Sequence, residues 1–414
     1  MADWQRRSVL RTGTALLAGG LLSSSGTADD LINEDQASLE EPTGWSSYGG
    51  NAGNTRYVPS ADDLEEPETI AWQYDETGAA AVVDGTVYLQ TDGEILQNDG
   101  EIHALDADDG CLLWTTGNIQ GLTTPAVADE AVFVTGDQLT AIEADSGDIR
   151  WCNTFGDNAV SSAPVVAFET VYVVVNGTLY AFDTADGSCC WKRDSVSVTY
   201  ELPHNDSPSQ TSYIFNTRYD SIAATDGAVW ALLDDRASEG SINTDAVAAF
   251  DPRTGETQWS AHLKPGYYAR GLTVTEDTLF IENETERGVM IFDRAEEEHG
   301  DFIPDALATA TANGRTVTRG RDGLAMYNSR SSWSKDGMHR YGRPTIADET
   351  VVVAHSVNGS RVTDEIIGFD LESGSERWRF TFDDAQWSDG FSVDCFVAGE
   401  TVYINRNDGL TALR

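Results

Sequence analysis

The sequence predicts an all-β protein, a β-propeller of eight four-stranded blades, and two repeated patterns carry this prediction. In the first, an acidic residue is followed four positions later by Gly and eight positions later by Trp. In the second, a turn precedes a short β-rich run, and this pair recurs with a mean spacing of about 45 residues, the period of a propeller blade. The apolar runs are short throughout, and none resembles a membrane-spanning helix.

The Gly-Trp motif has fixed internal spacing, and a small residue stands two positions before each acidic residue. Its copies are Asp106-Gly110-Trp114, Glu143-Gly147-Trp151, Asp183-Gly187-Trp191, Asp251-Gly255-Trp259 and Asp370-Gly374-Trp378. Asp bonds backbone amides in turns and Gly adopts positive φ, so this pair suits the turn between the third and fourth strands of a blade. We expect each Trp to lie on the outer strand and to bury its ring against the next blade.

The strands of one unit can be assigned directly from the second motif copy. They are expected at 125–128, 131–135, 138–143 and 149–153, because short apolar runs there alternate with turn residues. Two later units are irregular. The fifth has no Gly-Trp after Asp293, and in the sixth Trp333 stands too close to the preceding strand to fit the spacing. Seven blades therefore remain the alternative to eight.

The two ends of the propeller are expected to meet in one blade. The last unit stops after its third strand, at residues 410–414, and has no Trp of its own. The segment 69–74 contains a β-rich run and Trp72, with no strands assigned before it. We predict that this N-terminal strand completes the last blade and closes the ring, because closure removes exposed strand edges.

The Ala-x-Asp-x-x-x-Gly-x-x-x-Trp element resembles the tryptophan-docking motif of the PQQ-like β-propeller family. The leader at residues 45–57 is similar to the segment that precedes these propellers, so the resemblance covers about residues 45–414. This family includes quinoprotein alcohol dehydrogenases and the BamB-like assembly proteins, and the acidic composition indicates a haloarchaeal type. The resemblance implies the fold and leaves the activity open, because one fold hosts many functions.

The resemblance also implies what a dehydrogenase of this family would need. It would bind the quinone PQQ over an aromatic floor, with Ca²⁺ held by carboxylate and amide oxygens and an Asp as base. The chain has no Cys-x-x-Cys-His motif for a haem and little length left for a covering lid. We therefore expect no cofactor, and keep PQQ with Ca²⁺ as the alternative.

The N-terminus has the pattern of an export signal. Arg6-Arg7 precede a short apolar stretch and then small residues, which is typical of the twin-arginine route. We predict a signal peptide at 1–28, an acidic linker at 29–44 and a single propeller domain at 45–414. After removal of the signal, no segment is expected to span a membrane.

The net charge of −43 indicates the salt concentration at which the protein is stable, and says little about its function. Such self-repulsion destabilises a compact state in dilute salt and is screened at molar salt, so we predict a halophilic protein. The same charge excludes a nucleic-acid partner of the basic-patch kind.

One group of links between blades differs from this acidic background. If each blade runs from its inner to its outer strand, the links between blades share a face with the turns between second and third strands. These links carry Arg and aromatic residues, the types that anchor interfaces. The candidate binding face consists of Tyr267, Tyr268, Arg270, His339, Arg340, Tyr341, Arg343 and Trp387. The alternative is that these loops pack on one another and their arginines pair with local acids.

No motif for catalysis or metal binding is found. The histidines and cysteines have no zinc-site spacing, so we predict no catalytic residue and no metal site. The five cysteines are interpreted as small buried hydrophobic residues, although an exported protein could form one or two disulfides. The prediction is an exported, monomeric, non-catalytic binding or assembly scaffold at the cell surface with a protein partner in the envelope. The alternative is a PQQ-dependent dehydrogenase that oxidises an alcohol or sugar.

Overall fold

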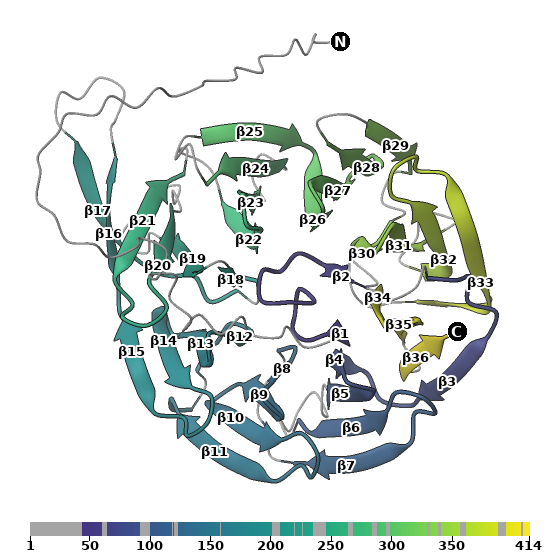
Figure 1. Cartoon of the computed structure of the whole chain (residues 1–414), viewed down its shortest axis with the longest axis horizontal. Coiled ribbons are helices and arrows are strands. Elements are labelled where there is room, and N and C mark those ends of the chain that lie inside the picture. Colours follow the sequence, from purple (N-terminus) through teal and green to yellow (C-terminus); the bar gives the residue numbers. More distant parts are fainter. Residues whose placement is uncertain are drawn as a thin grey trace, which may run out of the picture. The chain divides into compact units, whose positions relative to one another are not determined.

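The computed structural model shows eight sheets arranged as a ring, each built on an antiparallel four-stranded blade (Figure 1). This confirms the eight-bladed propeller, and the seven-bladed alternative is wrong. The structure describes residues 44–59, 64–91, 100–117, 119, 123–157, 159–200, 208–218, 220–225, 227–234, 246–263, 268–283, 288–294, 299–328, 332–337, 341–356, 362–387, 395–406 and 409–414. Within these ranges no helix occurs, and so none is long and apolar enough to cross a bilayer.

Blades 1 to 4 each place their strands from the centre outward in chain order. They comprise β4 (Gly78–Val83), β5 (Thr86–Thr91), β6 (Ile102–Asp106) and β7 (Leu112–Thr116); β8 (Ala126–Ala128), β9 (Ala131–Thr135), β10 (Gln138–Glu143) and β11 (Ile149–Thr154); β12 (Val165–Ala167), β13 (Thr170–Val175), β14 (Thr178–Asp183) and β15 (Cys189–Arg193); and β18 (Ile222–Thr225), β19 (Ala228–Asp234), β20 (Ala246–Phe250) and β21 (Thr257–His262). Blade 4 also carries a hairpin of β16 (Val196–Tyr200) and β17 (Ser209–Phe215), which pairs with β19.

Blades 5 to 8 repeat the arrangement. They comprise β22 (Ala269–Val274), β23 (Thr278–Asn283), β24 (Gly288–Asp293) and β25 (His299–Pro304); β26 (Ala306–Ala312), β27 (Arg315–Gly320), β28 (Gly323–Tyr327) and β29 (Ser332–Asp336); β30 (Thr345–Ala347), β31 (Thr350–His355), β32 (Val362–Asp370) and β33 (Glu376–Trp387); and β34 (Cys395–Ala398), β35 (Thr401–Arg406), β36 (Gly409–Leu413) and β3 (Ile70–Tyr74).

Burial explains why the inner and outer strands of a blade differ in amino-acid composition. Second strands pack against neighbouring blades on both faces, so β13 is buried at all six positions and consists of Thr, Tyr and Val. The outer strand β11 borders solvent and is exposed or half-buried along its length. The strands expected for the second unit agree with β8–β11 to within one residue at their ends.

The N-terminal strand closes the ring, as predicted. β3 pairs antiparallel with β36, and Trp72 lies opposite Ala412. The Trp72 indole nitrogen donates to the carbonyl of Ala107 in blade 1 at 2.9 Å. The two ends of the propeller domain are therefore joined within blade 8, and the closing strand also contacts blade 1.

Five contacts between blades share one tryptophan geometry. Each indole N–H donates to a backbone carbonyl of the next blade at 2.8–3.1 Å, and each ring face is covered by a Gly with positive φ whose added Cβ would meet the ring at 2.5–2.8 Å. The pairs are Trp72 with Gly110, Trp114 with Gly147, Trp151 with Gly187, Trp191 with Gly255 and Trp333 with Gly374. Only Gly fits these turns, because any side chain would clash with the indole.

Trp333 takes part in this set although its sequence spacing argued against it. It pairs with Met326 across β28 and β29, as Trp114 pairs with Ala104 in blade 1, while the turn between the two strands is shorter. Cross-strand register, rather than sequence spacing, therefore explains how Trp333 comes to dock. Trp378 differs from the set, because its buried N–H has no acceptor in the described part of the chain.

The leader forms a floor across the centre of the ring (Figure 1). β1 (Gly44–Trp45) pairs with β4, so Gly44 at the end of the predicted linker already belongs to the propeller. β2 (Tyr57–Val58) pairs in parallel with β30 of blade 7. Between them, leader carbonyls accept hydrogen bonds from inner strands of five blades, from the amides of Val127, Ala224, Val274, Thr311 and Ile346.

Two leader side chains reinforce this floor. The amide of Asn54 donates to the carbonyls of Ile222 at 2.7 Å and Leu272 at 3.0 Å, which joins blades 4 and 5. The buried guanidinium of Arg56 donates to Pro344 O at 2.8 Å and stacks 5.0 Å from the Trp45 ring centroid. The leader is therefore a structural part of the propeller.

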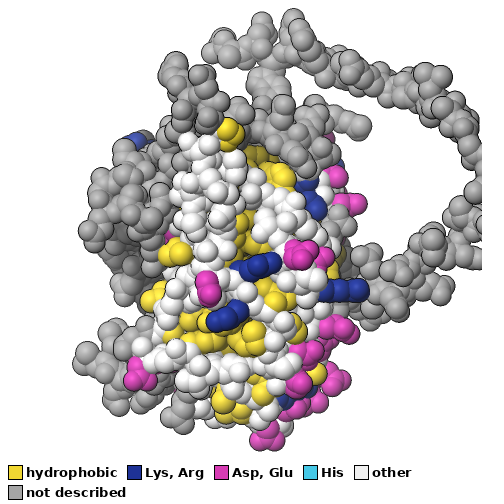
Figure 2. Space-filling model, turned by 90° about the vertical axis from the view of Figure 1, so that its left-hand side faces the viewer, with side chains coloured by type: hydrophobic (Ala, Val, Ile, Leu, Met, Phe, Trp, Pro, Cys, Tyr) yellow, Lys and Arg dark blue, Asp and Glu magenta, His cyan; other side chains and the backbone are white. Residues whose placement is uncertain are grey.

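Charge is distributed unevenly over the side of the ring drawn in Figure 2. Asp and Glu side chains gather along one border of this view, while apolar side chains and a few Lys and Arg side chains lie together in its middle. Part of this surface therefore departs from the strongly acidic average of the chain.

Candidate functional site at the inner ends of blades 4, 5 and 7

The two faces of the ring are built from different connections. The amide of Phe155, in the link from β11 to β12, donates to the carbonyl of Asp137, in the turn between β9 and β10, at 2.9 Å. The links therefore share a face with the turns between second and third strands, which we call the link face. The leader contacts Ala224 and Val274 near the other ends of β18 and β22, on the opposite turn face.

A group of charged side chains gathers at the link face and is called here the acid–arginine cluster. It consists of Arg218 and Asp220 before β18, Arg270 on β22, Glu282 on β23 and Arg343 before β30. The two carboxylates approach the same backbone position: a Cβ added to Gly271 would meet Oδ2 of Asp220 at 2.7 Å and Oε2 of Glu282 at 3.1 Å. Gly271 is therefore what allows the two acids to come together.

Glu282 is the most deeply buried member, with 7% of its surface exposed. Its Oε1 accepts a hydrogen bond from the Thr309 amide at 3.1 Å, whereas its Oε2 has no hydrogen-bond donor among the described residues. Burial raises the pKa of Glu282 to about 7; Arg343 opposes this rise and the charge of Asp220 adds to it. This carboxyl group therefore changes its charge near neutral pH.

Burial and nearby charges also shift the pKa of Asp220. Burial raises the pKa of Asp220, while the guanidinium groups of Arg343, Arg270 and Arg218 lower it. Three arginines face two acids, so the cluster is net positive within a chain of net charge −43.

Two tyrosines border the cluster. Arg343 donates to the hydroxyl of Tyr48 at 2.8 Å and lies 5.7 Å from its ring centroid, which connects the cluster to the leader. Arg218 lies 5.6 Å from the ring centroid of Tyr268, and 37% of the Tyr268 surface is exposed. The neighbouring Arg270 is also exposed. Aromatic and guanidinium groups are thus presented together at the link face.

The structure places only part of the predicted binding face. Tyr268, Arg270 and Arg343 lie at the cluster. Tyr341 packs instead within blade 7, with its ring 4.9 Å from that of His355. Tyr267, His339 and Arg340 lie outside the described residues, and Trp387 ends β33 with its side chain outside the described part.

Sequence reasoning missed the two acids. Neither Asp220 nor Glu282 was singled out from the sequence. The counterparts of Glu282 on the second strands of blades 1 to 3 are Gln90, Thr135 and Val174, all neutral and buried. The available signal was a carboxylate at a position where blades 1 to 3 have neutral residues.

The interpretation of the cysteines as buried residues is wrong for four of the five. Cys111, Cys152, Cys189 and Cys190 are exposed free thiols, and Cys395 is buried. The exposed four lie on or beside the outer strands β7, β11 and β15. An outer strand has no further strand beyond it, so small apolar residues there remain in contact with solvent.

The described residues do not fit a calcium–quinone centre. No group of three or more His, Cys, Asp or Glu side chains that could hold a metal ion occurs among them. At the acid–arginine cluster, the surplus of guanidinium groups disfavours a divalent cation beside Asp220 and Glu282.

The ring of eight four-stranded blades with docked tryptophans defines the class, a PQQ-like repeat propeller. A family model described as outer membrane protein assembly factor BamB (PQQ_2) matches residues 98–232 and 243–409. The chain belongs to this family. No curated protein sequence matches the chain.

Solved structures with the same fold include both enzymes and an assembly factor. A quinohemoprotein alcohol dehydrogenase from Comamonas testosteroni has a TM-score of 0.64 at 12% identity, covering 90% of this chain and 80% of its own. BamB from Moraxella catarrhalis has a TM-score of 0.56 at 14% identity, covering 82% and 97%. A europium-containing methanol dehydrogenase has a TM-score of 0.62 at 12% identity, covering 88% and 89%. At these identities, the likeness shows the fold alone.

Proposed function

We propose that this chain is an exported, non-catalytic binding or assembly scaffold at the cell surface, and that its partner is a protein of the cell envelope. The observation that carries this proposal is the pairing of exposed Tyr268 and Arg270 beside a net positive cluster on the link face. Tyr and Arg are the residues that most often dominate binding energy at interfaces. A positive area on a strongly acidic protein favours an acidic protein segment.

The fold supports the same proposal. The leader fastens seven of the eight inner edges from the turn face, so the link face rests on a rigid base. A rigid base lets a scaffold present loops without losing conformational entropy on binding. Membership of a family described as an assembly factor is consistent with this role.

The test compares two double variants at molar salt. Tyr268→Ala with Arg270→Ala removes two exposed side chains of the link face. Tyr327→Ala with Arg253→Ala removes an exposed pair of the same types elsewhere and is the matched control. Cross-linking in intact cells should recover the same envelope protein with the wild type and the control, and lose it with the link-face variant. Recovery of that protein with all three chains would contradict the proposal.

The same preparation tests the enzyme alternative. Purified protein is mixed with PQQ and Ca²⁺ at molar salt, and absorbance and dye-coupled oxidation of alcohols and sugars are recorded. We expect no retained quinone and no turnover, because the arginines of the acid–arginine cluster repel a divalent cation. Retained quinone with turnover would show that the protein is a dehydrogenase and would overturn the scaffold proposal.

A further inference from the structure

In the contact between blades 4 and 5, no glycine of the described residues covers the tryptophan as in the regular contacts. Trp259 lies opposite Ala249, the register of a docking tryptophan. In blade 5, Phe292 pairs with His299, which leaves a turn of the usual length. The sequence has Glu297 where the motif has Gly, at a position outside the described residues. A residue with a Cβ cannot lie on the indole as those glycines do, because they leave only 2.5–2.8 Å.

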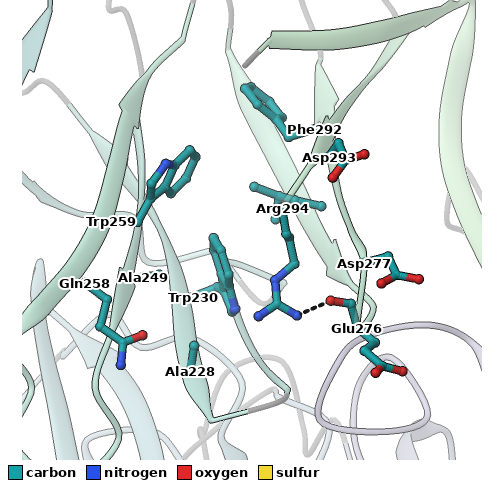
Figure 3. Close-up of a pocket in the computed structure, with 11 residues that line it drawn as sticks. Ala228, Trp230, Ala249, Gln258, Trp259, Glu276, Asp277, Phe292, Asp293 and Arg294 are labelled. Atoms are coloured by element: carbon teal, nitrogen blue, oxygen red, sulfur yellow. Dashed lines mark hydrogen bonds between the residues drawn. The ribbon is translucent and has the colours of Figure 1, made fainter. Parts of the chain in front are cut away.

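A cavity of about 370 Å³ lies at this place, within the size range of small-ligand sites (Figure 3). Aromatic rings from both blades form its walls. The centroids of Trp230 and Trp259 are 5.7 Å apart with their planes at 57°, and those of Trp259 and Phe292 are 6.4 Å apart at 76°. The cavity therefore offers flat apolar surfaces at an angle to one another.

Polar groups lie among these rings. The indole N–H of Trp230, a residue 5% exposed, has no acceptor among the described residues. The guanidinium of Arg294 lies 5.2 Å from the Trp230 ring centroid and donates to the carbonyls of Thr275 and Glu276. Figure 3 shows the carboxylate of Asp277 and the amide of Gln258 at the edges of the same space. Donors and acceptors are thus both present.

We propose that this cavity binds a saccharide of one or two rings. The C–H face of a sugar packs on an indole, and its hydroxyl groups both donate and accept hydrogen bonds. The amide of Gln258 and the carboxylate of Asp277 at the edges of the cavity offer these hydroxyl groups donors and acceptors (Figure 3). Arg294 already occupies the Trp230 face that would attract a cationic ligand. This mixture of groups therefore fits a sugar better than an organic cation.

The site is independent of the proposed partner surface. Its polar residues Glu276, Asp277 and Arg294 belong to turns between first and second or third and fourth strands, which lie on the turn face, and Asp293 ends β24 beside them. The acid–arginine cluster lies on the link face. Failure of either proposal would therefore leave the other standing.

The experiment titrates the full chain at molar salt with glucose, galactose, N-acetylglucosamine, maltose and cellobiose, and follows tryptophan fluorescence and saturation-transfer NMR. At least one of these sugars should change the fluorescence in a saturable way. Trp259→Ala should weaken its binding at least about tenfold. Gln258→Ala and Asp277→Asn change exposed side chains, preserve the fold, and should weaken binding about threefold or more.

Two controls separate binding from folding. Trp151→Phe alters a tryptophan that Gly187 covers, and should leave sugar affinity unchanged. Glu297→Gly restores the motif, should let the turn pack on Trp259, and should abolish binding without unfolding the chain. Absence of binding by all five sugars, binding unaffected by Gln258→Ala and Asp277→Asn, or binding of tetramethylammonium alone would overturn the assignment.

Discussion

Blades 1 to 3 and blades 4 to 5 use the same strand plan in different ways. In blades 1 to 3, every outer-strand tryptophan is covered by a glycine turn, and the position equivalent to Glu282 is neutral. In blades 4 and 5, a cavity adjoins Trp259, and Glu282 and Asp220 carry buried carboxyl groups. The regular blades maximise packing, whereas the irregular pair gives up packing and places polar groups where a ligand or partner could use them.

The largest effect should come from filling a glycine turn in the regular blades. Gly187→Val should lower the free energy of unfolding by about 4 kcal/mol, because the residue has a φ of +69° and its Cβ would meet Trp151 at 2.5 Å. Gly85→Val should cost only about 1–2 kcal/mol, because Gly85 has a φ of +78° and open space around it. Urea unfolding at molar salt measures both.

The counterpart position in blade 5 sharpens the contrast. The sequence already has a residue with a Cβ there, Glu297, so Glu297→Val introduces no new Cβ and should change the free energy of unfolding by less than about 0.5 kcal/mol. A loss at residue 297 comparable with that of Gly187→Val would show that blades 4 and 5 pack as tightly as the others.

The buried carboxyl group of blade 5 should give the next largest effect. The pKa of Glu282 is raised from 4.5 to about 7, so the folded state holds a proton that the unfolded state releases earlier. Its stabilising contribution is complete below about pH 4.5 and is lost as the pH rises to about 7. Glu282→Gln cannot ionise, so its stability relative to the wild type should rise by about 3 kcal/mol over this range.

The measurement is urea unfolding of both proteins at several pH values and constant molar salt. Thr135→Val, at the equivalent position of blade 2, is the control, since neither side chain there titrates and its difference from wild type should not depend on pH. A pH-independent difference for Glu282→Gln would show that Glu282 is ionised throughout and is paired rather than protonated.

Most of the fold could be predicted from the sequence because it rests on local, repeated chemistry. The acid-Gly turn and the outer-strand Trp recur at one spacing. The last unit of the sequence lacks a fourth strand, and the segment that contains Trp72 supplies it. Trp333 escaped this reasoning, since its place depends on pairing with Met326 and not on the distance along the chain.

The candidate site could be predicted only in part, for a related reason. Arg270 and Arg343 were recognisable as cations in acidic surroundings. Their meeting with Asp220 and Glu282 depends on three different blades and on the absence of a side chain at Gly271. The cavity beside Trp259 could not be predicted either, because the sequence shows that Gly is replaced at position 297 and not how much space lies beside the indole.

A smaller difference is expected between two tryptophans, one in a regular contact and one beside the cavity. Trp151→Phe removes the N–H that donates to Thr184 O at 3.1 Å and shrinks a ring clamped by Gly187, so it should cost about 2 kcal/mol. Trp259 has no such bond to the described residues and borders a cavity, so Trp259→Phe should cost less than about 1 kcal/mol. Unfolding midpoints in urea, read at one pH and salt concentration, decide the order. Equal costs would mean that the cavity wall is as firmly packed as a regular contact, and the contrast between blades 1 to 3 and blades 4 and 5 would then rest on charge alone.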